Sequence, residues 1–109
     1  MAEAARLAVD RGAAVVDINF GCPVKKVALG QQAGSALMRN EVAAGRILEA
    51  TVRAVSVPVT LKMRMGWDHS SLNAPRLARI AEAAGIRLVT VHGRTRQQFY
   101  TGTADWAFV

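Results

Sequence analysis

Hydrophobic and polar positions along the chain follow two periods, one typical of strands and one typical of helices. Short β-branched and apolar runs have the composition of strands. Between them, apolar residues recur at the three- to four-residue spacing of an amphipathic helix. The first predicted helix covers residues 3–11, the second begins after Asn40 and is about fifteen residues long, and the third covers residues 74–84. The predicted strands cover residues 14–20, 59–64 and 86–92. This αβαβαβ order predicts right-handed crossover connections and a parallel sheet.

Residues at the helix ends support these boundaries. Asn40 and Asn73 are of the type that caps helices, and Pro75 suits a first helical turn, where its missing N–H does no harm. Gly12 and Gly85 follow the first and third helices and suit a left-handed terminus. The apolar faces predicted for the three helices are Ala4, Leu7 and Ala8; then Ala44, Ile47, Leu48, Val52 and Val55; then Leu77, Ile80, Ala81 and Ala84.

Each strand has one apolar face and one face that becomes polar towards its carboxyl end. Side chains alternate across a strand, so Lys62 and Arg64 share the polar face of the second strand. Asn19 and His92 lie on the corresponding faces of the first and third strands, near their carboxyl ends, and Cys22 follows Asn19 by three residues. In a (β/α)8 barrel this face points inward, and its carboxyl end lines the mouth where active sites lie. The sequence therefore predicts that these side chains converge.

Two architectures fit the element order, an open doubly wound parallel sheet and a (β/α)8 TIM barrel. No GxGxxG motif follows any of the three strands, so the commonest dinucleotide-binding form of the open sheet loses support. The predicted fold class is α/β, as part of a TIM barrel with about three consecutive β/α units.

Cys22 is the one cysteine of the chain and lies between Gly21 and Pro23. It excludes an internal disulfide here, and the lack of a close Cys/His cluster argues against a structural zinc site. A lone cysteine is most often a small buried residue, but a loop with Pro23 and two lysines suits that role poorly. A nucleophile with His92 as its base and a general acid that protonates a carbon under reduction are both open from the residues alone.

The charge of the chain favours an anionic partner. Fourteen Lys and Arg against eight Asp and Glu give a net charge of +6, which suits RNA, DNA or phosphorylated ligands. Acidic residues elsewhere in a longer protein would explain the same imbalance equally well. The apolar runs are far shorter than the roughly 20 residues that cross a bilayer, and no signal-peptide pattern begins the chain. We expect a cytoplasmic protein without membrane contact.

Four segments, taken in order, resemble the central part of a tRNA-dihydrouridine synthase of the bacterial B type. They are DINFGCPVKKV, AGSALM, VPVTLKMRMGW and VTVHGRTRQQFYTGTADW, and the resemblance covers residues 14–109. NxGCP, KxRxG and HGRT are specific at these separations, although each would be weak alone. The resemblance implies an FMN-dependent oxidoreductase that reduces the C5–C6 double bond of selected uridines in tRNA, with NADPH reducing the flavin.

The resemblance also implies roles for individual residues. Cys22 would donate the proton to C5 of the uracil while the flavin delivers hydride to C6. Lys62 and His92 would contact the flavin, and Asn19 and Arg64 would face the uracil. The candidates for contacts with tRNA are Lys25, Lys26, Arg94 and Arg96.

Three of the eight strands of a barrel are recognisable in this chain. We therefore expect residues 1–109 to be a fragment of one FMN-binding catalytic domain, without the helical C-terminal tRNA-binding domain of the family. Phosphate sites in this fold typically follow strands 7 and 8, so the chain alone is expected to bind flavin poorly and to be inactive. Two alternatives are an FMN-barrel reductase of a free pyrimidine, similar to dihydroorotate or dihydropyrimidine dehydrogenases, and an inactive RNA-binding remnant.

Overall fold

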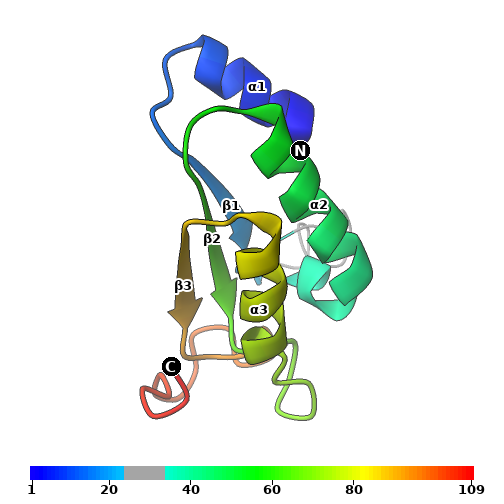
Figure 1. Cartoon of the computed structure of the whole chain (residues 1–109). Helices are drawn as coiled ribbons and strands as arrows, with labels where there is room; N and C mark the ends of the chain where they lie inside the picture. Colours follow the sequence, from blue (N-terminus) through cyan, green and yellow to red (C-terminus); the bar gives the residue numbers. More distant parts are fainter. Residues whose placement is uncertain (24–33) are drawn as a thin grey trace.

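Three strands and their connecting helices make up the fold in a computed structural model, which describes residues 1–23 and 34–109 (Figure 1). The α-helices are α1 (Ala2–Asp10), α2 (Glu41–Ala54) and α3 (Ala74–Ala84), and a 3-10 helix, η2 (Gly34–Arg39), precedes α2. The strands are β1 (Val16–Phe20), β2 (Val59–Arg64) and β3 (Leu88–His92). The predicted α/β order is confirmed, and β2 has the predicted bounds.

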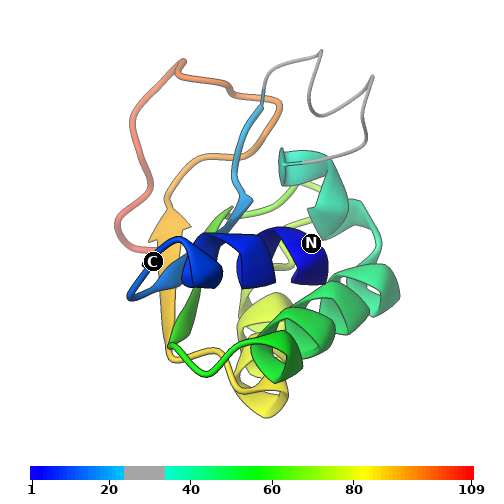
Figure 2. The ribbon, with the colours of Figure 1, turned by 90° about the horizontal axis from the view of Figure 1, so that it is seen from above.

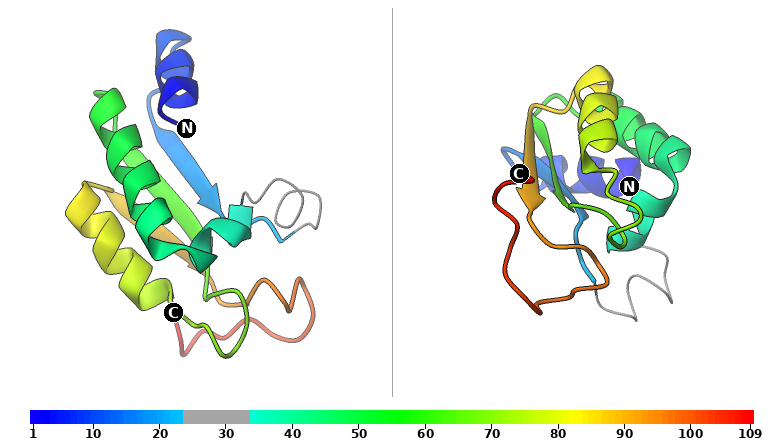
Figure 3. Two further views of the ribbon diagram at one scale, coloured as in Figure 1. Left: turned by 90° about the vertical axis from the view of Figure 1, so that its right-hand side faces the viewer. Right: turned by 90° about the horizontal axis from the view of Figure 1, so that it is seen from below.

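The strands form one parallel sheet in the order β1-β2-β3. Asn19 pairs in register with Lys62, and Arg64 pairs with His92, so the polar strand ends lie next to one another. Helices α2 and α3 lie side by side on one face of the sheet, as the side view shows (Figure 3). A parallel sheet with helices in the crossovers is the arrangement of consecutive units of a (β/α)8 barrel.

The core lies between the sheet and the two covering helices. The sheet contributes the apolar face predicted from alternation, with Ile18, Phe20, Val59, Leu61 and Met63 all buried. Helices α2 and α3 bury Ala44, Leu48, Leu77 and Ala81 against it. The opposite face carries exposed residues, among them Asp17, Lys62 and Thr90. This uncovered face would point into the interior of a barrel.

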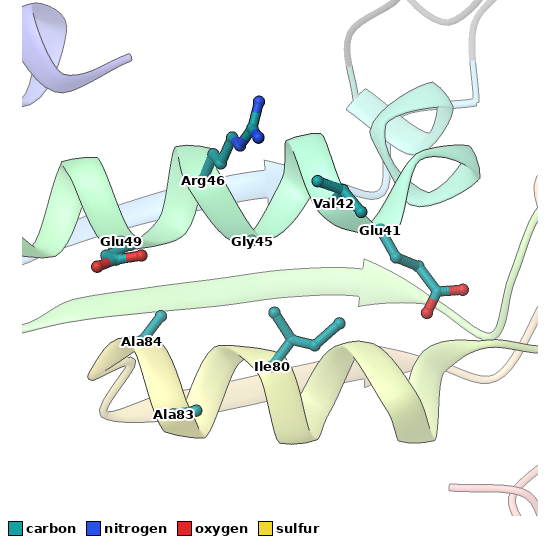
Figure 4. Close-up of a pocket in the computed structure, with 8 residues that line it drawn as sticks. All are labelled: Glu41, Val42, Gly45, Arg46, Glu49, Ile80, Ala83 and Ala84. Atoms are coloured by element: carbon teal, nitrogen blue, oxygen red, sulfur yellow. The ribbon is translucent and has the colours of Figure 1, made fainter.

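A glycine sets how closely α2 and α3 approach. A Cβ added to Gly45 would lie 3.0 Å from Cγ2 of Ile80, and the close-up shows the two residues facing each other across the groove between the helices (Figure 4). Glycine inside a helix costs about 1 kcal/mol relative to alanine. Close packing therefore explains why this position has no side chain.

Two details of the helices differ from the sequence prediction. In α1 the buried residue is Ala5, whereas Ala4, Leu7 and Ala8 are exposed. Helix α1 lies beyond the start of β1 and contacts mainly α2, and the view from above shows it nearest the viewer (Figure 2). Asn40 caps α2 as predicted, accepting from Ala43 N at 3.0 Å. Asn73 precedes α3 but forms no capping hydrogen bond with its side chain, which reaches towards η2 instead. Helices long and apolar enough to span a membrane are absent from the described ranges.

Candidate functional site

The carboxyl ends of the three strands surround a pocket of about 290 Å³. The five predicted site residues, Asn19, Cys22, Lys62, Arg64 and His92, all contribute to its lining, together with Gly21, Pro23 and Tyr100. Each strand supplies at least one of the five, as expected from the shared facing of their polar ends. The structure therefore brings these side chains together, while their chemical roles stay predictions.

Asn19 shapes the turn that carries Cys22. Its Oδ1 accepts a hydrogen bond from Gly21 N at 2.7 Å, which is the local bond that asparagine often forms in turns. The chain therefore bends immediately after β1, and Cys22 lies half-buried at the pocket with a free thiol. Cys22 is therefore not a small residue buried in the core.

Gly34 and Ser35, at the start of η2, form a clamp on the backbone of Cys22. Ser35, which is fully buried, donates to the carbonyl of Cys22 from its backbone N at 3.0 Å and from its Oγ at 2.7 Å. Gly34 has φ +57°, and a Cβ there would lie 2.8 Å from both Cβ and O of Cys22. The start of η2 therefore fixes the backbone beneath the thiol, and the sequence analysis did not identify this clamp.

Arg64 is buried, with 1% of its surface exposed. Its Nε donates to the carbonyl of Gly21 at 3.0 Å, and its Nη1 donates to the carbonyls of Thr95, at 2.9 Å, and Phe99. Burial lowers the pKa of the guanidinium, and charge interaction with Tyr100 opposes that shift. Arg64 thus ties the turn before Cys22 to the loop after β3, in addition to lining the pocket.

Tyr100 is a lining residue that the sequence analysis missed. Its ring lies 5.2 Å from Cζ of Arg64 and 6.4 Å from the ring of His92. Phe99, just before it, has φ +59°, a left-handed conformation that is rare for an aromatic residue. Strained backbone of this kind gathers at functional sites. An aromatic residue with a polar tip in the loop after β3 was the one signal in the sequence that could have identified it.

His92 is held as a neutral imidazole. Burial lowers its pKa, and the positive charges of Arg64, Arg94 and Lys62 lower it further. Nη1 of Arg94 lies 3.1 Å from Nε2 of His92. A guanidinium only donates, so Nε2 must accept and the proton is on Nδ1. His92 therefore offers one N–H donor near the exposed ammonium of Lys62.

Two of the four predicted tRNA contacts belong to the described residues, and they lie in different places. Arg94 is half-buried and bonds to His92 and to the carbonyl of Gly102, at 3.0 Å, within its own loop. Arg96 lies away from the pocket, against Trp67. Lys25 and Lys26 lie outside the described residues. Within residues 1–23 and 34–109, no three His, Cys, Asp or Glu side chains come together as a metal site.

Comparisons with known proteins identify one family. Residues 1–109 match the family described as Dihydrouridine synthase (Dus). A probable tRNA-dihydrouridine synthase of Rhizobium leguminosarum bv. phaseoli is 64% identical over 106 residues, which is 97% of this chain and 33% of that protein. A probable tRNA-dihydrouridine synthase of Rickettsia bellii is 62% identical over 109 residues, covering 100% of this chain and 33% of that protein.

A relative named for the B type is similar to the same extent. The tRNA-dihydrouridine synthase B of Xanthomonas campestris pv. campestris is 60% identical over 109 residues, covering 100% of this chain and 32% of that protein. The chain thus spans about a third of the length of the curated relatives it matches.

Proposed function

The chain belongs to the dihydrouridine synthase family, and from this membership we propose that it supplies part of the active site of an FMN-dependent enzyme. The proposed reaction reduces selected uridines of tRNA to 5,6-dihydrouridine, with NADPH as the reductant. The observation that supports it most strongly is the pocket in which Asn19, Cys22, Lys62, Arg64 and His92 meet.

The donors in this pocket fit a flavin. Lys62 is a cation, and His92 is a neutral imidazole with its proton on Nδ1. The carbonyl oxygens and ring nitrogens of an isoalloxazine are acceptors whose electronics respond to nearby positive charge and hydrogen bonds. Lys62 and His92 are therefore the residues that we propose to hold the flavin ring. When bound, the flavin would supply hydride to C6 of the uracil.

Cys22 is the proposed proton donor. General acid catalysis needs a group within reach of the atom that is protonated, and it typically contributes 10²- to 10⁴-fold in rate. The thiol lies at the pocket, and its backbone is fixed by Ser35 and by the turn at Asn19. The S–H proton would go to C5 and form the new C–H bond, and the thiolate would then recover a proton from solvent.

The uracil would be held by the remaining polar groups of the pocket. Oδ1 of Asn19 is engaged by Gly21 N, which directs its amide nitrogen as the donor for a ligand carbonyl. Arg64 has three backbone carbonyls as partners. We therefore propose that Arg64 acts on the substrate mainly by holding the walls of the pocket, with any direct contact to the uracil as a secondary role.

We further propose that the 109-residue chain alone binds FMN poorly and reduces nothing. It spans about a third of the length of its relatives, and phosphate sites of this fold usually follow strands 7 and 8 of the barrel. Flavin absorbance after purification of the chain is the test. Retention of stoichiometric FMN would contradict this proposal.

The proposed reaction is tested in a strain from which the complete reading frame has been deleted. Nucleoside digests of its tRNA should lack one or more dihydrouridines, and the restored reading frame should return them. Unchanged dihydrouridine in the deletion strain would overturn the proposal. Loss of growth on a free pyrimidine, with tRNA unchanged, would instead favour the free-pyrimidine reductase.

A further inference from the structure

A second polar pocket lies at the same end of the sheet as the reaction pocket. It has a volume of about 320 Å³ and lies between η2, the start of α2, the start of α3 and the loop after β2. The residues that matter on its wall are Arg39, Glu41, Trp67, Asp68, Asn73 and Arg76. Nothing in the proposed reaction uses this pocket.

Two guanidinium groups meet at the ring of Trp67. Cζ of Arg39 lies 4.5 Å from the ring centroid, and Cζ of Arg96 lies 4.7 Å from it. Across the part of the chain that the structure describes, neither arginine forms an ion pair, and the buried Nε of Arg96 has no hydrogen-bond partner. Two like charges at one ring repel each other, so an anion bound beside them would be stabilised.

One of the two carboxylates of the pocket is paired with an arginine of its own. Both oxygens of Glu41 accept from Arg76, at 3.2 and 3.0 Å. These hydrogen bonds lower the pKa of Glu41, so the carboxylate is ionised and offsets the charge of Arg76. Asp68 accepts from both N and Oγ of Ser70. Arg39 on the pocket wall and Arg96 beside Trp67 therefore remain without an ion pair among the described residues, while Asp68 keeps its negative charge in the same pocket.

Asn73 adds an acceptor to the same wall. It is 6% exposed, and its Nδ2 donates to the carbonyl of Met38 at 2.7 Å and to Glu41 at 3.2 Å. Its buried Oδ1 has no partner among residues 1–23 and 34–109. A buried acceptor of this kind requires a donor such as a hydroxyl group. A ribonucleotide has phosphate oxygens that can accept from the arginines and a 2′-hydroxyl that can donate to the amide oxygen of Asn73.

The position of the pocket suits a neighbour of the reacting nucleotide. Trp67 follows Arg64 by three residues, so their Cα atoms are at most about 11 Å apart. The loops after β2 and β3 are joined by hydrogen bonds from Met65 N to Arg94 O, at 3.1 Å, and from Arg96 N to Gly66 O, at 3.0 Å. The two pockets thus lie on loops that are hydrogen-bonded to each other, and a base drawn into the first would bring its flanking nucleotides towards the second.

We propose that Arg39, Trp67 and Arg96 form a binding site for the phosphate and ribose of an RNA nucleotide that flanks the reacting uridine. This inference rests on the proposed function, because it assumes that RNA is the substrate. The site adds affinity through phosphate neutralisation and takes no part in proton or hydride transfer.

The experiment uses the protein encoded by the complete reading frame, with Arg39→Ala, Arg39→Gln and Arg96→Ala variants. Arg46→Ala is the matched control, because Arg46 is an exposed arginine of α2 that extends away from α3 (Figure 4). The probe is an unmodified tRNA transcript, titrated at several salt concentrations. Each of the three variants should bind about tenfold more weakly at about 0.1 M salt, and the slope of log K against log salt should fall by about one. Arg46→Ala should match the wild type.

A second readout distinguishes RNA binding by the arginines from a purely structural role. Flavin content and NADPH oxidation without tRNA should be the same in all variants and in the wild type. Wild-type affinity and salt slope in Arg39→Gln and Arg96→Ala would overturn this proposal, even if the wild type makes dihydrouridine. Failure of the wild type to make dihydrouridine, with tRNA binding that still depends on both arginines, would overturn the proposed function and leave the RNA site standing.

Discussion

Replacing Arg64 tests whether this residue holds the walls of the reaction pocket together. Its Nε and Nη1 donate to carbonyls of Gly21, Thr95 and Phe99, and the side chain is buried. In Arg64→Lys the charge is kept, but one ammonium nitrogen cannot occupy the positions of both Nε and Nη1. At least one buried carbonyl therefore loses its partner.

The expected magnitude follows from the number of bonds lost. A hydrogen bond to a charged group contributes about 1.5–3 kcal/mol, and a buried acceptor without a partner costs about 1–3 kcal/mol. We expect Arg64→Lys to lower the free energy of unfolding by about 2 kcal/mol. Arg64→Met leaves the carbonyls of both Gly21 and Thr95 without partners and should lower it by about 4 kcal/mol. The carbonyl of the exposed Phe99 can be satisfied by water and is left out of this sum.

Urea denaturation of the protein from the complete reading frame measures these changes, with Arg79→Lys and Arg79→Met as controls on the exposed side of α3. Alkylation of Cys22, followed by mass spectrometry of its peptide, should also be faster in the Arg64 variants, because the turn before Cys22 loses its link to the loop after β3. If Arg64→Met unfolds within about 0.5 kcal/mol of the wild type and alkylation of Cys22 is unchanged, the account of Arg64 as a tie between loops is wrong.

Three further predictions concern the backbone under Cys22 and the charge state of His92. Gly34→Ala should lower the free energy of unfolding by more than about 2 kcal/mol, because the new Cβ would lie 2.8 Å from Cys22 and the φ is left-handed. Gly12→Ala is the control: its φ is +102° and no atom lies within 4 Å, so it should cost about 1 kcal/mol. Ser35→Ala removes one of two hydrogen bonds to the Cys22 carbonyl, should cost about 1 kcal/mol, and should speed alkylation of the thiol. The pKa of His92 is lowered in the folded state, so protonation of this residue favours unfolding. His92 has no effect on the free energy of unfolding above the unfolded pKa of about 6.5, and it lowers that free energy as the pH falls from there towards the folded pKa. The loss of stability between pH 7 and pH 5, measured by urea denaturation, should therefore be smaller in His92→Gln than in the wild type.

Each of these predictions has a contrary result. Equal costs for Gly34→Ala and Gly12→Ala would show that the close approach to Cys22 is not maintained in solution. An alkylation rate in Ser35→Ala that matches the wild type would show that the clamp does not restrain the thiol. The same pH dependence of stability in His92→Gln and the wild type would show that His92 is not held neutral by its surroundings.

Alternation along the strands was enough to predict most of the fold and the convergence of the site. Val59, Leu61 and Met63 are buried as predicted, and β2 begins and ends where the apolar pattern does. Strands β1 and β3 each begin two residues later than predicted, at Val16 and Leu88. Apolar composition continues before the pairing begins, and composition alone cannot tell where hydrogen bonding to a neighbour starts.

What the sequence could not predict depends on contacts between loops distant along the chain. Alternation placed Arg64 on the polar face, but its buried position depends on hydrogen bonds to the carbonyls of Thr95 and Gly21, which are 31 and 43 residues away. Tyr100 lines the pocket from a loop in which the backbone at Phe99 is left-handed, a conformation that a phenylalanine in the sequence does not signal. Asn73 had the sequence signal of a helix cap, yet the carbonyl of Met38 competes successfully for its side chain. For Arg64 and Asn73, a partner from another element decided the outcome.

The account depends most directly on the thiol at the mouth of the pocket. The decisive measurement is the rate of dihydrouridine formation by Cys22→Ala in the protein from the complete reading frame, with flavin bound and reduced before tRNA is added. We predict that flavin content stays near the wild-type level while the rate falls by about 10²- to 10⁴-fold, the contribution of a general acid. A wild-type rate in Cys22→Ala would contradict the assignment of Cys22 as the proton donor.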